Sequence, residues 1–226
     1  MRQKTSILEQ YNDVLSDVYD TATTSPDFNW RAPKKSNKLL LPYVKGCCKV
    51  LDLGIGTGQS SEALYQAGCE ITGVDVSQKM IDITQSKFPE WRLYKADIDK
   101  EFPTLPNNSF DIIIAVGILE FVENIKRVLQ EIITLLKSNG VLCVTFEEYL
   151  PESKTQQWKV SELGKGLIDS IPDTHSFYVY RRSFNEMKDI FLNTKLEIIK
   201  DEQFIAYFKT KEKISTTYRI FLLKKK

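Results

Sequence analysis

The chain has 226 residues, of which 42% are hydrophobic and 11% aromatic, and this length suits one domain that buries roughly 70% of its unfolded surface. Its 31 basic and 30 acidic residues nearly cancel, so charge gives no argument for binding to nucleic acid or to a membrane surface. The start is polar, no apolar run approaches the roughly 18 residues of a membrane helix, and four cysteines without C-x-x-C spacing accompany a single histidine. We therefore expect a cytoplasmic protein with reduced cysteines, no metal site and no membrane span.

The N-terminal segment has apolar residues three and four positions apart, which predicts a helix over 6–22. Ser6 and Glu9 have the spacing of a capping box at the start of this helix. A loop rich in proline and asparagine follows, and a short helix is expected over 35–41.

The middle of the chain alternates between predicted strands and predicted helices. Strands are expected over 48–54, 70–75, 91–97, 109–117 and 141–146. The helices between them are expected over 60–66, from Ser77 to Phe88, and over 124–137. This alternation indicates an α/β protein with a doubly wound, mostly parallel sheet, and the polar alternation of the third strand places that strand at an edge.

The last third of the chain departs from this alternation. Residues 147–182 combine prolines, glycines and aromatic residues without a clear period. A helix is expected over 183–193, and the final strands over 195–208 and 216–224 form an antiparallel hairpin joined by a short turn. We expect one Rossmann-like, seven-stranded domain over 1–226, made of a helical lid (1–44), a cofactor-binding core (45–146), a substrate or cap segment (147–182) and a closing helix with the hairpin (183–226).

The most informative segment is VLDLGIGTG over 50–58, in which three glycines alternate after a buried strand. A phosphate-binding loop of the G-x-x-x-x-G-K-[ST] type is excluded because the loop has no lysine. A dinucleotide fingerprint, G-x-G-x-x-G, needs a third glycine at position 59, but this residue is Gln59 and the glycine comes earlier, at Gly58. The observed pattern is D-x-G-x-G-x-G, with Asp52 two residues before the first glycine.

Three acidic residues stand at the ends of three successive strands: Asp52, Asp75 and Asp97. A carboxylate at the glycine turn repels a pyrophosphate and attracts an ammonium group. Asp75 occupies the position at which such folds bind ribose hydroxyls. With no lysine expected near these acids, the site favours a cationic nucleoside with an amino-acid tail over a polyphosphate.

The segments VLDLGIGTG, GVDVS with Met80, KADI and FDIIIAVGILEFVEN follow one another within residues 45–146. Together they resemble the successive motifs of class I S-adenosylmethionine-dependent methyltransferases. The terminal hairpin is similar to the sixth and seventh strands of that family, and YNDVLSDVYD with NWRAP is similar to the lead-in of its small-molecule members. The resemblance implies S-adenosyl-L-methionine as the cofactor, S-adenosyl-L-homocysteine as the product, and methyl transfer by in-line displacement.

The resemblance also implies roles for single residues. Asp52 is expected near the amino group of the cofactor, Asp75 on both ribose hydroxyls, and Asp97 on the adenine amino group. The backbone approaches the methionine and ribose at Gly54, Gly56 and Gly58. Further contacts are implied for Val76 and Met80 on the adenine, Ile98 through its backbone N–H, Val116 and Gly117 under the methionine tail, Leu119 and Phe121 beside it, and Tyr11, Tyr19 and Arg31 as a closure over the cofactor. Ile55 stands where the family often has cysteine or alanine, and Asn12 where it often has aspartate.

The acceptor of the methyl group has no motif of its own. The fourth strand ends in AVGILEF, which reads as an apolar floor without the asparagine- or aspartate-Pro-Pro-Tyr type of motif that grips a flipped base. This favours a small, partly hydrophobic acceptor held between the lead-in helix and residues 147–182. Polar candidates to orient it or to act on it are Glu147, Glu148, Tyr149, Tyr178 and His175, of which only His175 has an ordinary pKa near neutrality.

Other functions stay open at this point. A methyltransferase acting on RNA or protein, a non-catalytic cofactor-binding module and a nicotinamide oxidoreductase are the alternatives, and the sequence does not indicate an oligomeric state.

Overall fold

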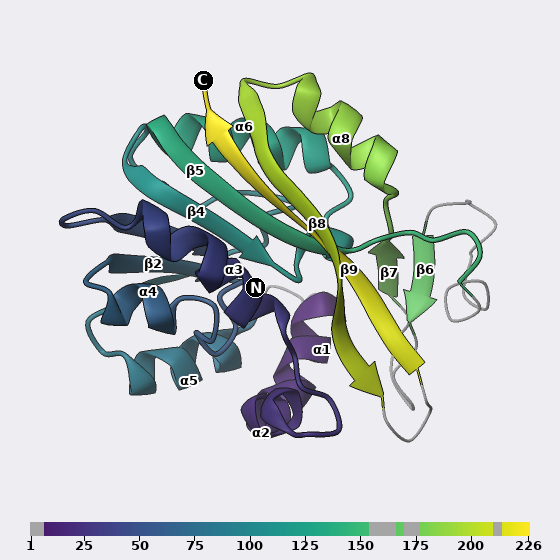
Figure 1. Ribbon diagram of the computed structural model, residues 1–226. Coiled ribbons are helices and arrows are strands. Elements are labelled where there is room, and N and C mark those ends of the chain that lie inside the picture. Colours follow the sequence, from purple (N-terminus) through teal and green to yellow (C-terminus); the bar gives the residue numbers. More distant parts are fainter. Residues whose placement is uncertain (1–6, 154–165, 170–176, 210–213) are drawn as a thin grey trace.

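The computed structural model describes residues 7–153, 166–169, 177–209 and 214–226. Its centre is a seven-stranded sheet with the strand order β3-β2-β1-β4-β5-β9-β8 (Figure 1). The strands are β1 Lys49–Leu53, β2 Glu70–Asp75, β3 Arg92–Lys95, β4 Phe110–Val116, β5 Leu136–Glu147, β8 Leu196–Lys209 and β9 Ile214–Lys225. The first five run parallel, and β9 lies antiparallel between β5 and β8. The predicted mostly parallel sheet with an antiparallel last strand is confirmed, and so is the edge position of β3.

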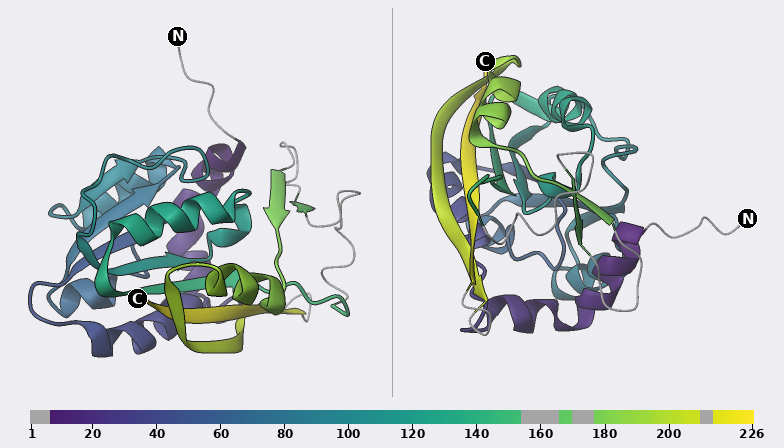
Figure 2. Two further views of the ribbon diagram at one scale, coloured as in Figure 1. Left: turned by 90° about the horizontal axis from the view of Figure 1, so that it is seen from above. Right: turned by 90° about the vertical axis from the view of Figure 1, so that its right-hand side faces the viewer.

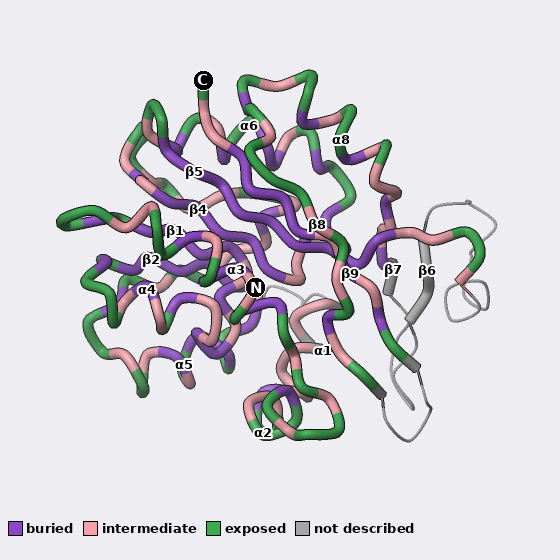
Figure 3. The backbone as a smooth tube through the Cα atoms, in the orientation of Figure 1, coloured by how far each residue is buried: buried purple, intermediate pink, exposed green. Residues whose placement is uncertain are grey.

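Helices cover both faces of this sheet (Figure 2). On one face lie α3 (Ala32–Leu40) and α4 (Glu62–Gln66), with α5 (Gln78–Lys87) next to α4, and on the other face lie α6 (Ile125–Leu135) and α8 (Phe184–Leu192). Successive side chains of a strand enter opposite cores. The central strands are therefore buried along their length (Figure 3), as expected for a sheet covered on both faces.

The lead-in segment lies at the end of the sheet toward which the parallel strands point (Figure 1). One helix was predicted here, but the segment is divided into α1 (Ile7–Leu15), the 3-10 helix η1 (Ser16–Val18) and α2 (Tyr19–Thr24). The break coincides with Ser16, whose hydroxyl donates to Asp13 O at 2.9 Å, and such local side-chain bonds compete with a regular helix. The predicted cap at Ser6 lies outside the described residues. We call Ile7–Thr24 the lid helices.

Two further boundaries differ from the prediction. Helix α3 begins at Ala32 instead of position 35, with a proline in its first turn, where proline is tolerated. Helix α6 ends at Leu135, and β5 begins immediately at Leu136. Pairing with β4 skips from Leu136 to Val141, so the segment predicted to end the helix is an irregularity inside the strand.

The predicted cap segment contains two short strands that the sequence did not indicate, β6 (Gly166–Asp169) and β7 (Phe177–Tyr180), paired antiparallel. The turn between β8 and β9, at 210–213, lies outside the described residues. In the described part of the chain no helix is long and apolar enough to cross a membrane. The four cysteines are free.

Candidate active site

The loop between β1 and α4 carries three glycines in the left-handed region, with φ of +73° at Gly54, +51° at Gly56 and +88° at Gly58. A Cβ at Gly54 would lie 2.3 Å from Ile118 Cδ1, and one at Gly58 would lie 3.0 Å from the Trp91 ring. A Cβ at Gly56 would meet no atom of the described residues within 4 Å. Gly56 is thus the glycine that turns bare backbone toward open space, whereas packing explains Gly54 and Gly58.

Asp75 ends β2 beneath this loop and is 8% exposed. Its Oδ2 accepts a hydrogen bond from Gly56 N at 2.8 Å, and its Oδ1 accepts one from Ser77 N at 2.9 Å. Burial raises the pKa of the Asp75 carboxyl, and the backbone donors offset part of this rise. Each oxygen of a carboxylate held in this way keeps a lone pair for a further donor, which suits a pair of vicinal hydroxyls.

Asp52 lies on β1 and is 1% exposed. Ser61 Oγ donates to its Oδ2 at 2.7 Å, while Oδ1 is buried with no hydrogen-bond partner among the described residues. Burial raises the pKa of Asp52 to about 7; the Ser61 hydrogen bond opposes this rise and the charge of Asp75 adds to it. The Asp52 side chain lines neither of the two cavities described below, so its contact with a cofactor amino group stays a prediction.

Asp97 follows β3. Its Oδ1 accepts a hydrogen bond from Asp99 N at 3.1 Å, and its Oδ2 lies 2.8 Å from Lys100 Nζ. The expectation that no lysine stands near the three acids is therefore wrong, because the turn after Asp97, in which Lys100 N bonds to Asp97 O, brings the two side chains together. The Lys100 side chain is 69% exposed, so solvent screens this pair strongly.

A first cavity, of about 90 Å³, lies over the carboxyl ends of β1, β2, β3 and β4. Its floor and walls combine Asp75 and Asp97 with apolar or bare positions, among them Gly54, Gly56, Val76, Met80, Ile98, Val116 and Gly117. From the lid helices Leu8, Asn12 and Tyr19 close it. The residue types fit a nucleoside with a charged tail. The free volume of this cavity is below the roughly 300–1,000 Å³ of ligand pockets.

Asp20 fastens the lid helices to the glycine loop. Its Oδ1 accepts hydrogen bonds from Thr57 Oγ1 at 2.5 Å and from Gln59 Nε2 at 2.7 Å, and its Oδ2 pairs with Lys87 of α5. Burial works against ionisation, but the hydrogen bonds from Lys87, Thr57 and Gln59 outweigh it and lower the pKa of Asp20. Sequence reasoning missed this contact, because an acid in an amphipathic helix reads as a solvated residue.

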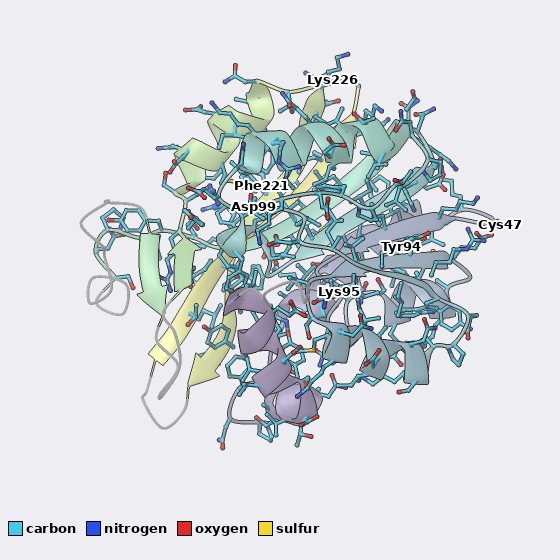
Figure 4. The ribbon with its side chains drawn as sticks, turned by 180° about the vertical axis from the view of Figure 1, so that it is seen from behind. Cys47, Tyr94, Lys95, Asp99, Phe221 and Lys226 are labelled. Carbon is cyan, nitrogen blue, oxygen red and sulfur yellow. The ribbon has the colours of Figure 1, made fainter. Side chains whose placement is uncertain are left out.

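Two further acids hold α1. Asp13 Oδ1 accepts a hydrogen bond from Ser77 Oγ at 2.6 Å, and Ser77 Oγ itself caps α5 by accepting from Met80 N at 3.2 Å. Glu9 pairs with Lys95 of β3, and Figure 4 shows Lys95 beside α1. The lid helices are thus tied to elements that also form the floor of the first cavity.

Arg31 was expected to close over the cofactor, but it does not line the first cavity, so this contact stays a prediction. The Arg31 guanidinium carbon lies 4.9 Å from the centre of the Phe208 ring, and Arg31 N donates to Ala206 O at 2.8 Å. Both contacts tie position 31 to β8, away from the first cavity. Tyr19 does line that cavity, and the side chain of Tyr11 lies outside the description.

A second cavity, of about 350 Å³, adjoins the first. The residues that line both cavities are Asn12, Tyr19, Gly117 and Phe121. One wall is aromatic: Phe28 stacks on Tyr207 with ring centres 4.3 Å apart, and Trp30 meets Tyr218 edge to face at 5.1 Å. This cavity has the size of a small-molecule pocket.

Glu120, in the 3-10 helix η3 (Leu119–Phe121), corrects the expectation of an apolar floor after β4. Leu119 does pack into the core, but Glu120 lines the second cavity and is 3% exposed. Tyr218 OH donates to Glu120 Oε1 at 2.6 Å. Burial raises the pKa of Glu120 to about 7, against the opposing effect of the Tyr218 hydrogen bond.

The acceptor candidates named from the sequence are separated by the structure. Glu147 lines the second cavity, with Oε1 2.6 Å from Arg181 Nε. Glu148, the residue directly after β5, does not line the second cavity, and its Oε2 accepts hydrogen bonds from Gln203 Nε2 at 2.8 Å and from Arg219 Nε at 3.1 Å. Tyr149 lines neither cavity. His175 and the side chain of Tyr178 lie outside the described part of the chain.

The raised pKa of Asp52 predicts how stability depends on pH. Between pH 3.8 and about 7 the folded chain keeps the proton of Asp52, whereas the unfolded chain has released it. The free energy of unfolding therefore falls as pH rises through this window, by up to about 1.4 kcal/mol per pH unit for one such group. Asp52→Asn should unfold in urea with a shallower fall between pH 4 and 7, part of which persists because Glu120 shifts in the same direction. Equal slopes in the two proteins would contradict a raised pKa at Asp52.

Residues 51–144 match the family model of the methyltransferase domain. The demethylmenaquinone methyltransferase of Tropheryma whipplei is 35% identical over 101 residues, which cover 42% of this chain and 40% of that protein. The ubiquinone biosynthesis O-methyltransferase of Coxiella burnetii is 33% identical over 128 residues, covering 53% and 54%. The chain thus spans about half the length of the curated relatives it matches.

A solved structure, described as a SAM-dependent methyltransferase from Methanosarcina mazei, superposes with a TM-score of 0.72 at 15% identity, over 83% of this chain and 96% of that one. This likeness concerns the fold, whereas the match over 51–144 concerns the residues of the site. The matched segment holds the glycine loop and the three strand-end acids. Residues 51–144 thus match the methyltransferase-domain family, and the chain has the fold of a solved SAM-dependent methyltransferase.

Proposed function

We propose that this chain transfers a methyl group from S-adenosylmethionine to a small-molecule acceptor that occupies the second cavity. The observation that carries the proposal is the common wall of the two cavities, made of Asn12, Tyr19, Gly117 and Phe121. A donor in one cavity and an acceptor in the other meet across this wall. In-line displacement needs mainly such positioning and the exclusion of water.

The cofactor cavity has the groups that S-adenosylmethionine requires. Asp75 is available to the ribose hydroxyls, Val76 and Met80 to the adenine faces, and Asp97 to the adenine amino group. Gly56 leaves room for the ligand beside bare backbone. When bound, this cofactor supplies a methyl group on a sulfonium centre, which is already an activated leaving group. The protein supplies orientation and, under the lid helices, exclusion of water.

A small acceptor is supported by the size of the second cavity, about 350 Å³, and by its position under the lid helices. A polymer cannot be enclosed in such a space except through one extended side group. The names of the relatives point in the same direction, since demethylmenaquinone, ubiquinone biosynthesis and, in Enterobacter, trans-aconitate appear among them.

The test has two steps. Calorimetric titration with S-adenosylhomocysteine should show saturable binding, while NADH should show none. Incubation with methyl-labelled S-adenosylmethionine and a metabolite extract, a transfer RNA pool or a peptide digest should then label only the metabolite fraction. Binding of NADH in preference to S-adenosylhomocysteine would overturn the cofactor assignment. Label in RNA or peptides alone would overturn the small acceptor.

A further inference from the structure

The second cavity contains a buried carboxylate, that of Glu120, which forms no salt bridge within the described part of the chain. Tyr218 satisfies Glu120 Oε1, but Glu120 Oε2 is buried with no hydrogen-bond partner among the described residues. A Cβ built on Gly117, which lines both cavities, would lie 4.0 Å from Glu120 Oε1. The carboxylate therefore stands close to the wall where the two cavities meet.

Arg182 fixes the turn that carries Glu120 and attracts its carboxylate without forming a salt bridge to it in the described part of the chain. Arg182 Nη1 donates to Leu119 O at 2.9 Å, and Nη2 donates to Val122 O at 2.6 Å and to Glu123 O at 3.1 Å. The side chain is 8% exposed. These carbonyl groups occupy its donors, so the guanidinium holds the backbone on both sides of Glu120 in place.

Among the described residues that line the second cavity, two acids, Glu120 and Glu147, stand against one cation, Arg181. Glu147 pairs with Arg181, whose Nε lies 2.6 Å from Glu147 Oε1, and Arg181 attracts Glu120 without forming a salt bridge to it, so this lining carries a net negative charge when Glu120 is ionised. An unpaired charge in such a place is costly, and a cation beside it removes the cost. Trp30 and Tyr207, with ring centres 5.8 Å apart, line the same space, and aromatic rings attract a nearby cation.

We propose that the second cavity binds a small amine as the methyl acceptor, with its ammonium group on Glu120 Oε2, and that this atom takes the proton which makes the nitrogen nucleophilic. The inference rests on the proposed function and gives it a substrate class.

The step balances as follows. An ammonium nitrogen has no free electron pair, so one N–H proton first moves to Glu120 Oε2. The electron pair left on nitrogen forms the new bond to the methyl carbon, and the pair of the broken carbon–sulfur bond stays on sulfur. The products are a methylated ammonium, S-adenosylhomocysteine and protonated Glu120, which returns its proton to water when the products leave.

Binding of shape-matched probes to protein saturated with S-adenosylhomocysteine tests the site without turnover. We expect phenethylamine to bind at pH 8 at least tenfold more tightly than 2-phenylethanol or 3-phenylpropionate. Glu120→Gln should remove this preference and keep its affinity for S-adenosylhomocysteine within threefold. Asp111→Asn, which alters an acid paired with Lys137 outside both cavities, should leave the preference unchanged.

The pH dependence separates proton uptake from a merely structural role. Alkylamines stay protonated up to about pH 9, so phenethylamine affinity should rise through a midpoint near the pKa of Glu120, about 7, as that group ionises. Facing Glu120 are Glu147, the arginines 181 and 182, and the tyrosines 207 and 218. Burial and the nearby acids raise the pKa of both tyrosines. Tyr218→Phe removes the donor to Oε1 and should shift the midpoint upward; Glu120→Gln should abolish the dependence.

Two results overturn the amine assignment while leaving the proposed function intact: S-adenosylhomocysteine binds but phenethylamine does not, or phenethylamine binds equally well to Glu120→Gln. If Glu120→Gln fails to fold, an unshifted midpoint in Tyr218→Phe overturns the assignment instead. Failure of the wild-type chain to bind S-adenosylhomocysteine overturns the proposed function, and the amine site with it.

Discussion

Replacing Asp75 by alanine is expected to weaken S-adenosylhomocysteine binding by about 30- to 1,000-fold, or about 2–4 kcal/mol, when measured by calorimetry. In this variant the two ribose hydroxyl groups of the ligand lose the charged carboxylate that is expected to accept their hydrogen bonds in a site with little water. The loss also frees Gly56 N and Ser77 N, whose hydrogen bonds to Asp75 hold the glycine loop against β2. Both effects act in the same direction, so the upper part of the range is expected.

The ribose contact can be separated from the effect on the loop. Wild-type protein should bind 5′-methylthioadenosine more tightly than its 2′-deoxy counterpart, and Asp75→Ala should bind the two alike. Asp111→Ala is the matched control, because Asp111 also accepts a backbone hydrogen bond, from Lys49 N at 2.9 Å, but lies outside both cavities. A folded Asp75→Ala protein that still distinguishes the two nucleosides would rule out the ribose assignment.

Replacing Gly56 by valine is expected to abolish S-adenosylhomocysteine binding in the same assay. The side chain would project into space that holds no atom of the described residues within 4 Å of its Cβ, and we assign this space to the cofactor. The positive φ of +51° adds strain of roughly 1–2 kcal/mol for a residue with a Cβ. Strain alone weakens the fold, whereas occupancy of the space blocks the ligand.

The chain offers a close control for this distinction. Gly46, in the turn before β1, has a φ of +53° and likewise no atom within 4 Å of a built Cβ, but it lies outside both cavities. Gly46→Val should lose a similar amount of stability in urea and keep wild-type affinity. Wild-type binding by Gly56→Val, or equal loss of binding in both variants, would show that the loop does not receive the cofactor.

The sequence predicted the elements of the core well because their signals are local. Apolar runs marked β1, β2, β4 and β5, and their alternation with amphipathic helices implied a parallel sheet. Ser77 was correctly predicted as a cap, since its hydroxyl accepts from Met80 N. Boundaries were less accurate: the propensities of 136–140 favoured the end of a helix, yet pairing with β4 draws Leu136 into a strand.

The position of the first cavity could be anticipated for the same reason. Its glycines and the acids Asp75 and Asp97 sit where strands end, and parallel strands bring these ends to one edge of the sheet. What the motif could not reveal is that only Gly56 faces open space, or that Lys100 folds back onto Asp97. Both depend on neighbours, Ile118 and Trp91 in the first case and a turn in the second.

The sequence by itself determined the fold class, the glycine loop and the strand-end acids, because short-range pattern encodes each of them. Only the tertiary structure decided the second cavity. Glu120 and Tyr218 are 98 positions apart and meet in a hydrogen bond, and Trp30 joins them from the segment after the lid helices. In the sequence Glu120 is one acid in an apolar run. The burial of Glu120 and its raised pKa arise only in the folded chain, where β9 pairs with β5 and brings Tyr218 against the Glu120 side chain. The reason is that the burial and the charge of a group depend on all the residues packed around it.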